Sequence, residues 1–431
     1  MKKEEAKAGA QYVYDYIKGI IDKTGPRLPG TEEERQGALL TAGIMEGISG
    51  KKAVVEEFDL HPNASIGAIP VVGYLGLISF AVYYLSPIAT LVLSTLTLLF
   101  SIAQIFTYSG WFDFLFPKRK SQNVYTTIEP KNGEEVKYTI CFSAHMDSCW
   151  CWNHSLRNPK TAIPKIVVGI VGFVLLIVMS AIAVGIGMYS FATMSELAAK
   201  GGQFDGMDVF KIVMYVLPVI TVPGSYWLAD YLTWDKKKAS PGAMDNLSGI
   251  GIFLAYANYV KEHPEVQPEG CRLMFAAMGA EEASLKGSFA FCKKHKDDGM
   301  LENMYNINLD SFRDDKYFAA VIGDLWLGSR FDRDLINLSK EAMAEALGED
   351  VTPKCPGEMF NPVGGCDSTP FCRAGVKTVT LVAQNPTLTD YYHTCNDTVE
   401  GLSMYSLEKG FETVVNLVPR IDELAKKQGL K

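Results

Sequence analysis

The sequence predicts an α/β domain that is interrupted by apolar insertions. Short apolar runs that end in polar motifs, such as residues 137–144 and 271–278, are typical of buried strands. Amphipathic helical patterns alternate with these runs, as in residues 248–261. Residues 66–112 contain no charged side chain, which is too long for a single buried strand or helix. These three observations together predict the α/β class and inserted transmembrane helices.

Four strands and four helices are expected in the α/β domain. The strands are short apolar runs bounded by glycine or polar residues, at 137–144, 271–278, 304–309 and 376–382. The helices have apolar residues at helical spacing, at 4–23, 248–261, 332–347 and 402–426. The first three strands lead directly into polar motifs around His145, Glu281 and Asp310. Ligand sites in open α/β sheets gather at such carboxyl ends of strands.

Two apolar insertions separate the parts of this domain. The first, residues 66–116, divides at Ser86-Pro87 into spans of about 20 residues, the length that crosses the hydrocarbon core. The second, residues 161–235, has a strong span at 166–190 and a weaker one at 209–229. Five of the six tryptophans flank these spans, as in an interfacial aromatic belt. We expect two transmembrane hairpins; a soluble protein with an apolar lid or dimer interface is the alternative.

Charge predicts the orientation of these hairpins. Lysines and arginines flank the spans on the side joined to the α/β domain, and few lie in the opposite turns. The positive-inside rule therefore predicts a multi-pass integral membrane protein with its α/β domain facing the cytoplasm. The odd cysteine count of nine, and an N-terminus without the pattern of a cleavable signal peptide, agree with this orientation.

Cysteine spacing and net charge bear on possible partners. Cys149 and Cys151 form a Cys-x-Cys pattern close to His145, for which buried free thiols are favoured over a redox or metal role. The net charge of −8 argues against nucleic acid, and no basic surface with interleaved aromatic residues is evident. We therefore expect a lipid bilayer, and no nucleic acid, among the partners.

Five polar motifs supply candidate metal ligands. They provide two imidazoles and three carboxylates, a mixture that suits borderline and hard divalent cations. An odd number of carboxylates also allows one of them to bridge two metals. Two further acids, Asp147 and Glu281, stand beside candidate ligands. The candidate ligands are His145, Asp245, Glu282, Asp310 and His393.

The order of these motifs, together with residues 25–31 (GPRLPGT) and 365–371 (GCDSTPF), resembles the M28 family of zinc peptidases. The resemblance extends from about residue 10 to the C-terminus, apart from the two insertions. It implies a three-layer α/β/α sandwich with a mostly parallel, mixed central sheet. This domain would be built from residues 1–65, 117–160 and 236–431.

The resemblance also implies a dinuclear zinc site. Asp245 would bridge two zinc ions. One ion would be completed by His145 and Asp310, and the other by Glu282 and His393.

Three further residues receive roles from the same resemblance. Glu281 would act as the general base. Asp147 would orient the imidazole of His145 by accepting its second N–H, as is common for metal-bound histidines. Tyr392 would donate a hydrogen bond to the developing oxyanion.

The function expected on this basis is that of a membrane-anchored dinuclear zinc exopeptidase, foremost an aminopeptidase acting on peptides. The alternatives are a carboxypeptidase or a hydrolase of lipid amides or other amphiphiles on the same metals. A single-zinc glutaminyl cyclase and a non-catalytic membrane scaffold are further alternatives. A carboxypeptidase needs a cation for the terminal carboxylate, for which Arg313, Lys286 and Arg373 are candidates.

Overall fold

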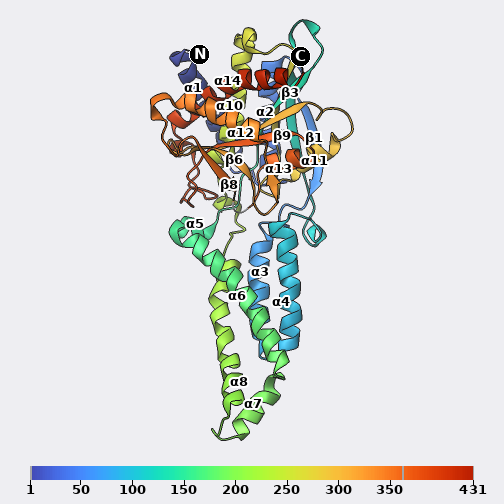
Figure 1. Ribbon diagram of the computed structural model, residues 1–431, viewed down its shortest axis with the longest axis vertical. Coiled ribbons are helices and arrows are strands. Elements are labelled where there is room, and N and C mark those ends of the chain that lie inside the picture. The colour runs from blue at the N-terminus through green and yellow to red at the C-terminus, as the bar shows by residue number, and fades with distance from the viewer. Residues whose placement is uncertain (1, 362–363, 431) are drawn as a thin grey trace. The chain divides into compact units, whose positions relative to one another are not determined.

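The computed structural model describes residues 2–361 and 364–430, which fold as two compact units (Figure 1). The first unit comprises Met1–Pro62, Pro117–Cys151 and Trp234–Lys431. The second unit comprises Asn63–Phe116 and Trp152–Thr233. The second unit therefore consists of two insertions into the first, which begin at residues 63 and 152, where the sequence suggested 66 and 161.

The first unit is built on a mixed sheet whose described strands follow the order β1-β2-β4-β3-β5-β9-β6-β7, with β8 beside β6. The four strands in the middle, β4, β3, β5 and β9, run parallel to one another. Antiparallel strands extend the sheet on both sides. The bounds are β1 Val54–Leu60, β2 Arg119–Ile128, β3 Tyr138–His145, β4 Cys271–Met278, β5 Met304–Phe312, β6 Phe318–Asp324, β7 Ser329–Arg330, β8 Gly357–Asn361 and β9 Lys377–Ala383.

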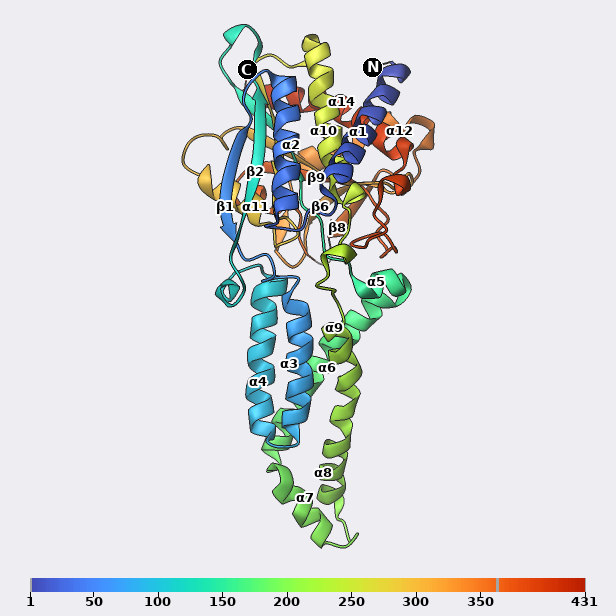
Figure 2. The ribbon, with the colours of Figure 1, turned by 180° about the vertical axis from the view of Figure 1, so that it is seen from behind.

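Helices cover both faces of this sheet. Alternate residues of β3 point to opposite faces, so Phe142 joins the core beneath α10, while Cys141 joins the core with Phe291 and Phe371. Figure 2 shows α1, α2 and α10 together on one face. The expected three-layer α/β/α sandwich is thus confirmed. The helices are α1 Lys3–Thr24, α2 Glu32–Ser49, α10 Ser248–Glu262, α12 Arg333–Leu347 and α14 Met404–Lys427 on one face, and α11 Lys286–Lys294 and α13 Ser368–Arg373 on the other.

Local sequence explains where these helices begin and end. The side chain of Thr31 accepts a hydrogen bond from the Glu34 amide and so caps α2, which ends at the left-handed Gly50. Ser403 caps α14 in the same way through the Ser406 amide. The helices expected from periodicity begin and end within two residues of α1, α10, α12 and α14.

The second unit is helical. Three of its helical stretches are long and apolar enough to cross a membrane by length and composition: Pro87–Phe106, Pro159–Gly185 and Gly206–Ala229, with 20, 27 and 24 residues. They contain α4 (Pro87–Ser101), α6 (Pro159–Gly185), and α8 (Gly206–Val216) followed by α9 (Val222–Ala229). Two shorter helices are α5 (Asn153–Arg157) and α7 (Ser190–Ala199).

The first apolar helix is shorter than expected. α3 spans Ala68–Tyr83, 16 residues, rather than the 20 of residues 66–85. It ends early because Ser86 caps the next helix through the Ala89 amide and Pro87 occupies the first turn of that helix. The fourth span, by contrast, is continuous through the 3-10 turn Leu217–Thr221 despite its prolines.

Helices from both insertions pack on one another within the second unit. A Cβ on Gly73 of α3 would lie 2.1 Å from the amide nitrogen of Ala229 in α9. A Cβ on Gly224 of α9 would lie 2.7 Å from the carbonyl oxygen of Val168 in α6. Small residues that allow such close backbone approach are typical of helix pairs in membranes.

Candidate metal centre

The polar motifs converge at the carboxyl ends of the parallel strands. His145 is the last residue of β3, and Glu281 and Glu282 follow β4 after a short turn. Asp310 lies near the end of β5, where the register of its pairing with β9 shifts between Asp310 and Phe312. Such an irregularity re-aims a side chain relative to the regular strand. The strand that was expected to end before Asp310 therefore continues past it.

Asp245 stands at the centre of the site, immediately before α10. Its Oδ1 lies 3.0 Å from Nε2 of His145, and its Oδ2 lies 3.0 Å from Nε2 of His393. The same nitrogen of His393 is 3.2 Å from Oε1 of Glu282. The two oxygens of one buried carboxylate thus face two different histidines, which is the arrangement that a bridging ligand requires.

Two groups of potential donor atoms surround Asp245. One group contains His145, Asp245 and Asp310, each with a donor atom within 4.8 Å of the others. The second contains Glu282, His393 and, in addition, Cys149 at the same spacing. The structure therefore brings together all five residues that the sequence analysis singled out as ligands, and it adds a thiol.

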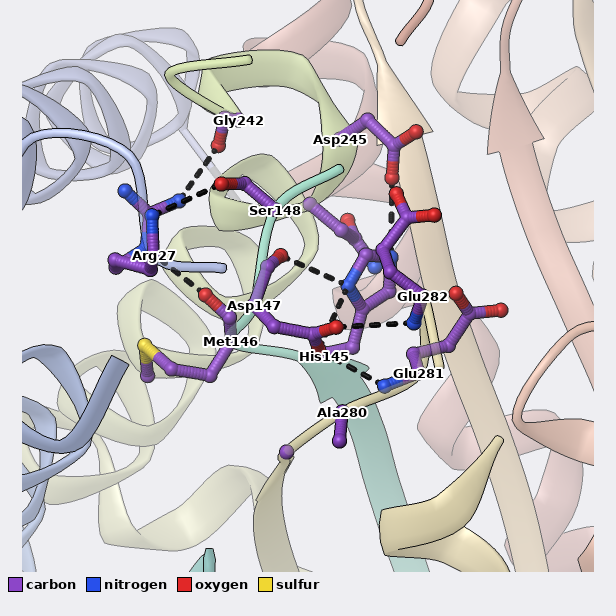
Figure 3. Close-up of polar contacts among 12 residues, drawn as sticks. Arg27, His145, Met146, Asp147, Ser148, Gly242, Asp245, Ala280, Glu281 and Glu282 are labelled. Atoms are coloured by element: carbon purple, nitrogen blue, oxygen red, sulfur yellow. Dashed lines mark hydrogen bonds and ion pairs between the residues drawn. The ribbon is translucent and has the colours of Figure 1, made fainter. Parts of the chain in front are cut away.

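Asp147 connects two of the predicted motifs. Its carboxylate accepts hydrogen bonds from the amides of Glu281 and Glu282, each at 2.9 Å (Figure 3). Nδ1 of His145 lies 3.1 Å from the backbone carbonyl of Asp147 and 3.5 Å from its Oδ1. The nearest partner of that imidazole nitrogen is thus the carbonyl, and the carboxylate fixes the backbone of the two glutamates.

The two glutamates leave this anchored backbone in different directions. Figure 3 shows Glu282 directed toward Asp245 and Glu281 directed to another side. Ala280, just before them, has a left-handed backbone with φ of 53°, and Ser311 and His393 share this conformation at 56° and 52°. Non-glycine residues rarely adopt it, and such residues cluster at functional sites.

Asp397 is a site residue that sequence reasoning missed. Its carboxylate accepts hydrogen bonds from the amides of Met244 at 2.8 Å and Asp245 at 3.1 Å. Nδ2 of Asn246 donates to the carbonyl of Leu309 at 2.9 Å, which ties this segment to β5 beside Asp310. These contacts hold the backbone of Asp245, and no pattern in the sequence indicates them.

Arg27, from the GPRLPGT motif, is a buried link between the two segments that carry His145 and Asp245. The side chain is fully buried, and its Nε donates to the Met146 carbonyl at 2.9 Å. Its two Nη atoms donate to the carbonyls of Pro241 at 3.0 Å and Gly242 at 3.2 Å (Figure 3). Arg27 therefore fixes the spacing between these two segments by hydrogen bonds to their backbones.

Several buried acids lie close together in the site, and burial and mutual repulsion shift their pKa values. Burial, with repulsion from Asp245, raises the pKa of Asp310 to about 7. Burial and the neighbouring Glu282 raise the pKa of Glu281 well above its usual value. Although burial opposes it, the two imidazoles hold the pKa of Asp245 below its usual value. The pKa values of His145 and His393 are raised by the surrounding acids against the effect of burial.

The donor set fits two divalent cations. Each donor group combines imidazole nitrogen with carboxylate oxygen, which zinc binds readily. Oε1 of Glu282, in a residue that is 5% exposed, accepts no hydrogen bond within the described chain. A buried acceptor of this kind needs a partner, and a cation beside His393 would supply one.

The remaining candidate residues lie in different environments. The ring of Tyr392 stacks on the imidazole of His393, with centroids 3.9 Å apart. Among the cations considered for a terminal carboxylate, Arg313 lies over the ring of Tyr391, 3.5 Å from its centroid. Arg373 donates to the carbonyl of Leu327 at 2.7 Å. Lys286 is the first residue of α11.

Comparison with known proteins finds a family that resembles part of the chain. The model of peptidase family M28 matches residues 234–418. Aminopeptidase YwaD of Bacillus subtilis (strain 168) is 27% identical over 188 residues, which cover 43% of this chain and 39% of YwaD. The chain thus matches well under half the length of this relative. A mixed sheet with potential metal donors at the carboxyl ends of its parallel strands defines an α/β domain suited to metal binding, and residues 234–418 of this domain match peptidase family M28.

Solved structures share the fold. BSAP, a zinc aminopeptidase from Bacillus subtilis, is 17% identical with a TM-score of 0.54, covering 95% of this chain and 94% of BSAP. A glutaminyl cyclase from Bacteroides thetaiotaomicron, bound to N-acetylhistamine, is 16% identical with a TM-score of 0.52, covering 95% of this chain and 96% of the cyclase. Because two different enzymes share this fold, the fold alone does not determine the reaction, which depends on the site residues.

Proposed function

We propose that this chain is a zinc-dependent exopeptidase with two zinc ions, and that it acts as an aminopeptidase on peptides. The observation that carries the proposal is the carboxylate of Asp245, whose two oxygens each face a different histidine at 3.0 Å. His145 and Asp310 would complete one zinc, and Glu282 and His393 the other. A site built for one zinc, as in the cyclase alternative, has no need of a carboxylate shared in this way.

Two zinc ions, when bound, supply Lewis acidity and lower the pKa of a water molecule held between them. Glu281 is the residue of this chain that would take the proton of that water and pass it to the leaving amine. It suits this role because it interacts with His145, Glu282 and Asp310 but belongs to neither group of potential metal donors. Asp147 holds the amides of both glutamates and so fixes the direction of each.

The acids around the proposed metals favour a substrate that presents a positively charged amino terminus. Besides burial, the carboxylates of Glu282, Asp367 and Asp310 all act to raise the pKa of Glu281, so several acids lie close together here. With two zinc ions bound, a peptide ammonium group would be attracted to Glu281 and Asp367, the acids of this group that would coordinate neither ion. Tyr392, which stacks on His393, would donate to the oxygen that gains negative charge.

We further propose that the second unit anchors the enzyme in a lipid bilayer. Its apolar helices leave many large side chains exposed, such as Val167, Val171, Val174 and Val178 of α6. A row of this kind is costly in water and favourable in lipid. The first unit would then face the cytoplasm, as the positive-inside rule predicts.

The variant Glu281→Gln tests the mechanism. It should keep two zinc ions per chain and lose turnover by at least about 100-fold, because general-base catalysis typically contributes that much or more. Zinc content is measured by elemental analysis, and turnover with an aminoacyl chromogenic substrate. The exposed Glu302→Gln is the matched control and should behave as wild type. A Glu281→Gln enzyme with near-normal turnover would contradict the assigned role.

Blocked dipeptides test the choice of aminopeptidase. A dipeptide with a free amino end and an amidated carboxyl end should be cleaved, whereas one with an acetylated amino end should not. The opposite result would favour the carboxypeptidase alternative. Cleavage of fatty-acyl amides in preference to either dipeptide would favour the lipid-amide alternative.

A further inference from the structure

Cys149 lies beside one of the two donor groups. Its thiol forms a group with donor atoms of Glu282 and His393, all within 4.8 Å of one another. Cys149 is fully buried, and Glu282 and His393 are 5% and 8% exposed. The other donor group, with His145, Asp245 and Asp310, contains only nitrogen and oxygen donors. The two donor groups therefore differ in donor type, because only the group with Glu282 and His393 contains a sulfur atom.

A second observation points to a ligand in the sulfur-containing half. Oε1 of Glu282 is buried and accepts no hydrogen bond from any described residue. It lies 3.2 Å from Nε2 of His393, which is itself 3.0 Å from Oδ2 of Asp245. Oxygen, nitrogen and sulfur atoms of Glu282, His393 and Cys149 thus lie within 4.8 Å of one another, and Asp245 contacts the same imidazole nitrogen. These donor types suit zinc, which can expand to five ligands and so still hold a water molecule.

The backbone around Cys149 is fixed on both sides. Ser148 exchanges hydrogen bonds with Arg27, through its amide at 3.0 Å and its hydroxyl at 2.9 Å. The carbonyl of Cys149 accepts from the amide of Ser240 at 2.9 Å, and the amide of Cys151 donates to the carbonyl of Lys238 at 2.9 Å. A ligand held on an anchored backbone loses little freedom when it binds a metal.

We propose that Cys149 is a thiolate ligand of the metal ion held by Glu282 and His393. The inference rests on the proposed dinuclear centre and adds a residue to it. On binding, the thiol gives its proton to solvent and the sulfur takes a position in the coordination shell of the ion. The buried thiol that sequence alone treats as inert then becomes part of the site.

A sulfur donor on one side only makes the two ions unequal. Thiolate selects zinc over manganese and magnesium, whereas a site of imidazole and carboxylate alone accepts harder ions. The Glu282 and His393 ion should therefore be held more tightly, and exchange of the other ion should come first. Partial loading with manganese should give a mixed enzyme with about one zinc per chain.

The test uses the full-length chain in detergent, loaded with cobalt(II) in place of zinc. A thiolate on cobalt gives a charge-transfer band in the near ultraviolet, which nitrogen and oxygen ligands do not. The band should be present in the wild type and in Cys151→Ser, and absent in Cys149→Ser. Cys151 is the matched control because it is also fully buried and lies in the same segment.

Two further measurements complete the test. Loss of an outer partner of a ligand typically weakens metal binding 10–100-fold, so loss of Cys149 itself should weaken one of the two ions by at least about 100-fold. Competition with a chromogenic chelator measures this affinity. X-ray absorption of the wild-type zinc protein needs no variant, and should show sulfur at about 2.3 Å from zinc.

The outcomes separate this inference from the proposed function. Two bound ions without any sulfur signal in the wild type would overturn the role of Cys149 and leave the dinuclear peptidase intact. A band that survives in Cys149→Ser and disappears in Cys151→Ser would overturn it as well. A wild-type chain that binds no metal and cleaves no peptide would contradict the proposed function, and this inference with it.

Discussion

At the scale of single residues, Asp245 and Asp310 should differ in how many ions depend on them. Asp245 faces both histidines, whereas Asp310 belongs to one donor group only. Asp245→Asn should therefore lose most of both zinc ions, and Asp310→Asn should keep about one ion per chain. Elemental analysis after gel filtration measures the stoichiometry.

The exposed Asp334→Asn serves as the control for this comparison and should bind two ions. If Asp245→Asn keeps one ion while Asp310→Asn loses both, Asp310 would be the shared ligand. The bridging role given to Asp245 would then be incorrect.

A second prediction at this scale concerns pH. Burial raises the pKa of Glu34 to about 8 and that of Asp397 to about 7, as it does for Asp310. An acid with a raised folded-state pKa stabilises the fold below its unfolded pKa, and this stability is lost as pH rises through the folded value. The histidines of the site, whose pKa values are also raised, act in the same direction.

The metal-free protein should therefore be more stable at pH 6 than at pH 8, by roughly 1–2 kcal/mol for each of these acids. Thermal unfolding in a chelator at the two pH values measures the difference. Zinc should reduce the dependence on pH, because it keeps Asp310 ionised and the histidines neutral. A metal-free protein that is more stable at pH 8 would show that these acids are ionised in the fold.

Side chains that would bind the metals could be predicted from sequence, whereas the backbone groups that supporting side chains bind could not. His145, Glu282 and His393 are recognisable by residue type and by their order along the chain. Asp397 and Arg27 act on amides and carbonyls, which every residue has. The residue types in the sequence therefore do not reveal which backbone groups these side chains bind.

At the scale of elements, the sequence analysis predicted the parallel strands in the middle of the sheet but not the antiparallel strands on either side. The four strands expected from apolar runs became β3, β4, β5 and β9, which are parallel and buried on both faces. β2 has buried polar residues at Ser121, Gln122 and Asn123, so its pattern is not that of an apolar strand. Asn123 instead uses its side chain to bind the backbone of Gly279 and Gly287.

Close helix packing in the second unit gives a prediction at the same scale. A side chain at Gly224 would meet the backbone of Val168 and Gly169 at 2.7 Å and 2.8 Å. Gly224→Val should therefore separate α9 from α6 and destabilise the unit by about 1–3 kcal/mol, the usual cost of overpacking. Thermal unfolding in detergent measures the loss.

Gly185, at the end of α6, provides the control, because a Cβ added there would have no neighbour within 4 Å. Gly185→Val should leave the unfolding midpoint nearly unchanged. Equal effects of the two substitutions would show that the α6–α9 contact does not limit stability.

At the scale of the whole molecule, a domain that in part resembles peptidase family M28 is combined with two apolar insertions. All five candidate ligands lie in the first unit, and both insertions enter it between motifs. The insertions therefore leave the sheet and the candidate ligands within one unit, and the proposed membrane anchor would lie in the other. Sequence could predict this division because uncharged stretches and metal motifs do not overlap along the chain.

At the same scale, the distribution of lysines and arginines around the apolar spans predicts how the chain is oriented in a membrane. Nine lysines and arginines lie on the side of the spans that is joined to the first unit: Lys118, Arg119, Lys120, Arg157, Lys160, Lys165, Lys236, Lys237 and Lys238. The opposite side has Lys200 and Lys211, and Lys200 pairs with Asp208 at 2.6 Å. Positive charge is retained in the cytoplasm, so the first unit should be cytoplasmic.

Reporter fusions in a bacterial host measure this orientation. Green fluorescent protein fused after the C-terminus should fluoresce, and alkaline phosphatase at the same position should be inactive. Alkaline phosphatase inserted at Gly201-Gly202, between α7 and α8, should be active, because that turn would be exported. An insertion in the turn Lys131–Gly133 of the first unit should report the same side as the C-terminus. An active phosphatase at the C-terminus would place the metal site outside the cytoplasm, where the substrate would be an extracellular peptide and the cysteines would meet an oxidising environment.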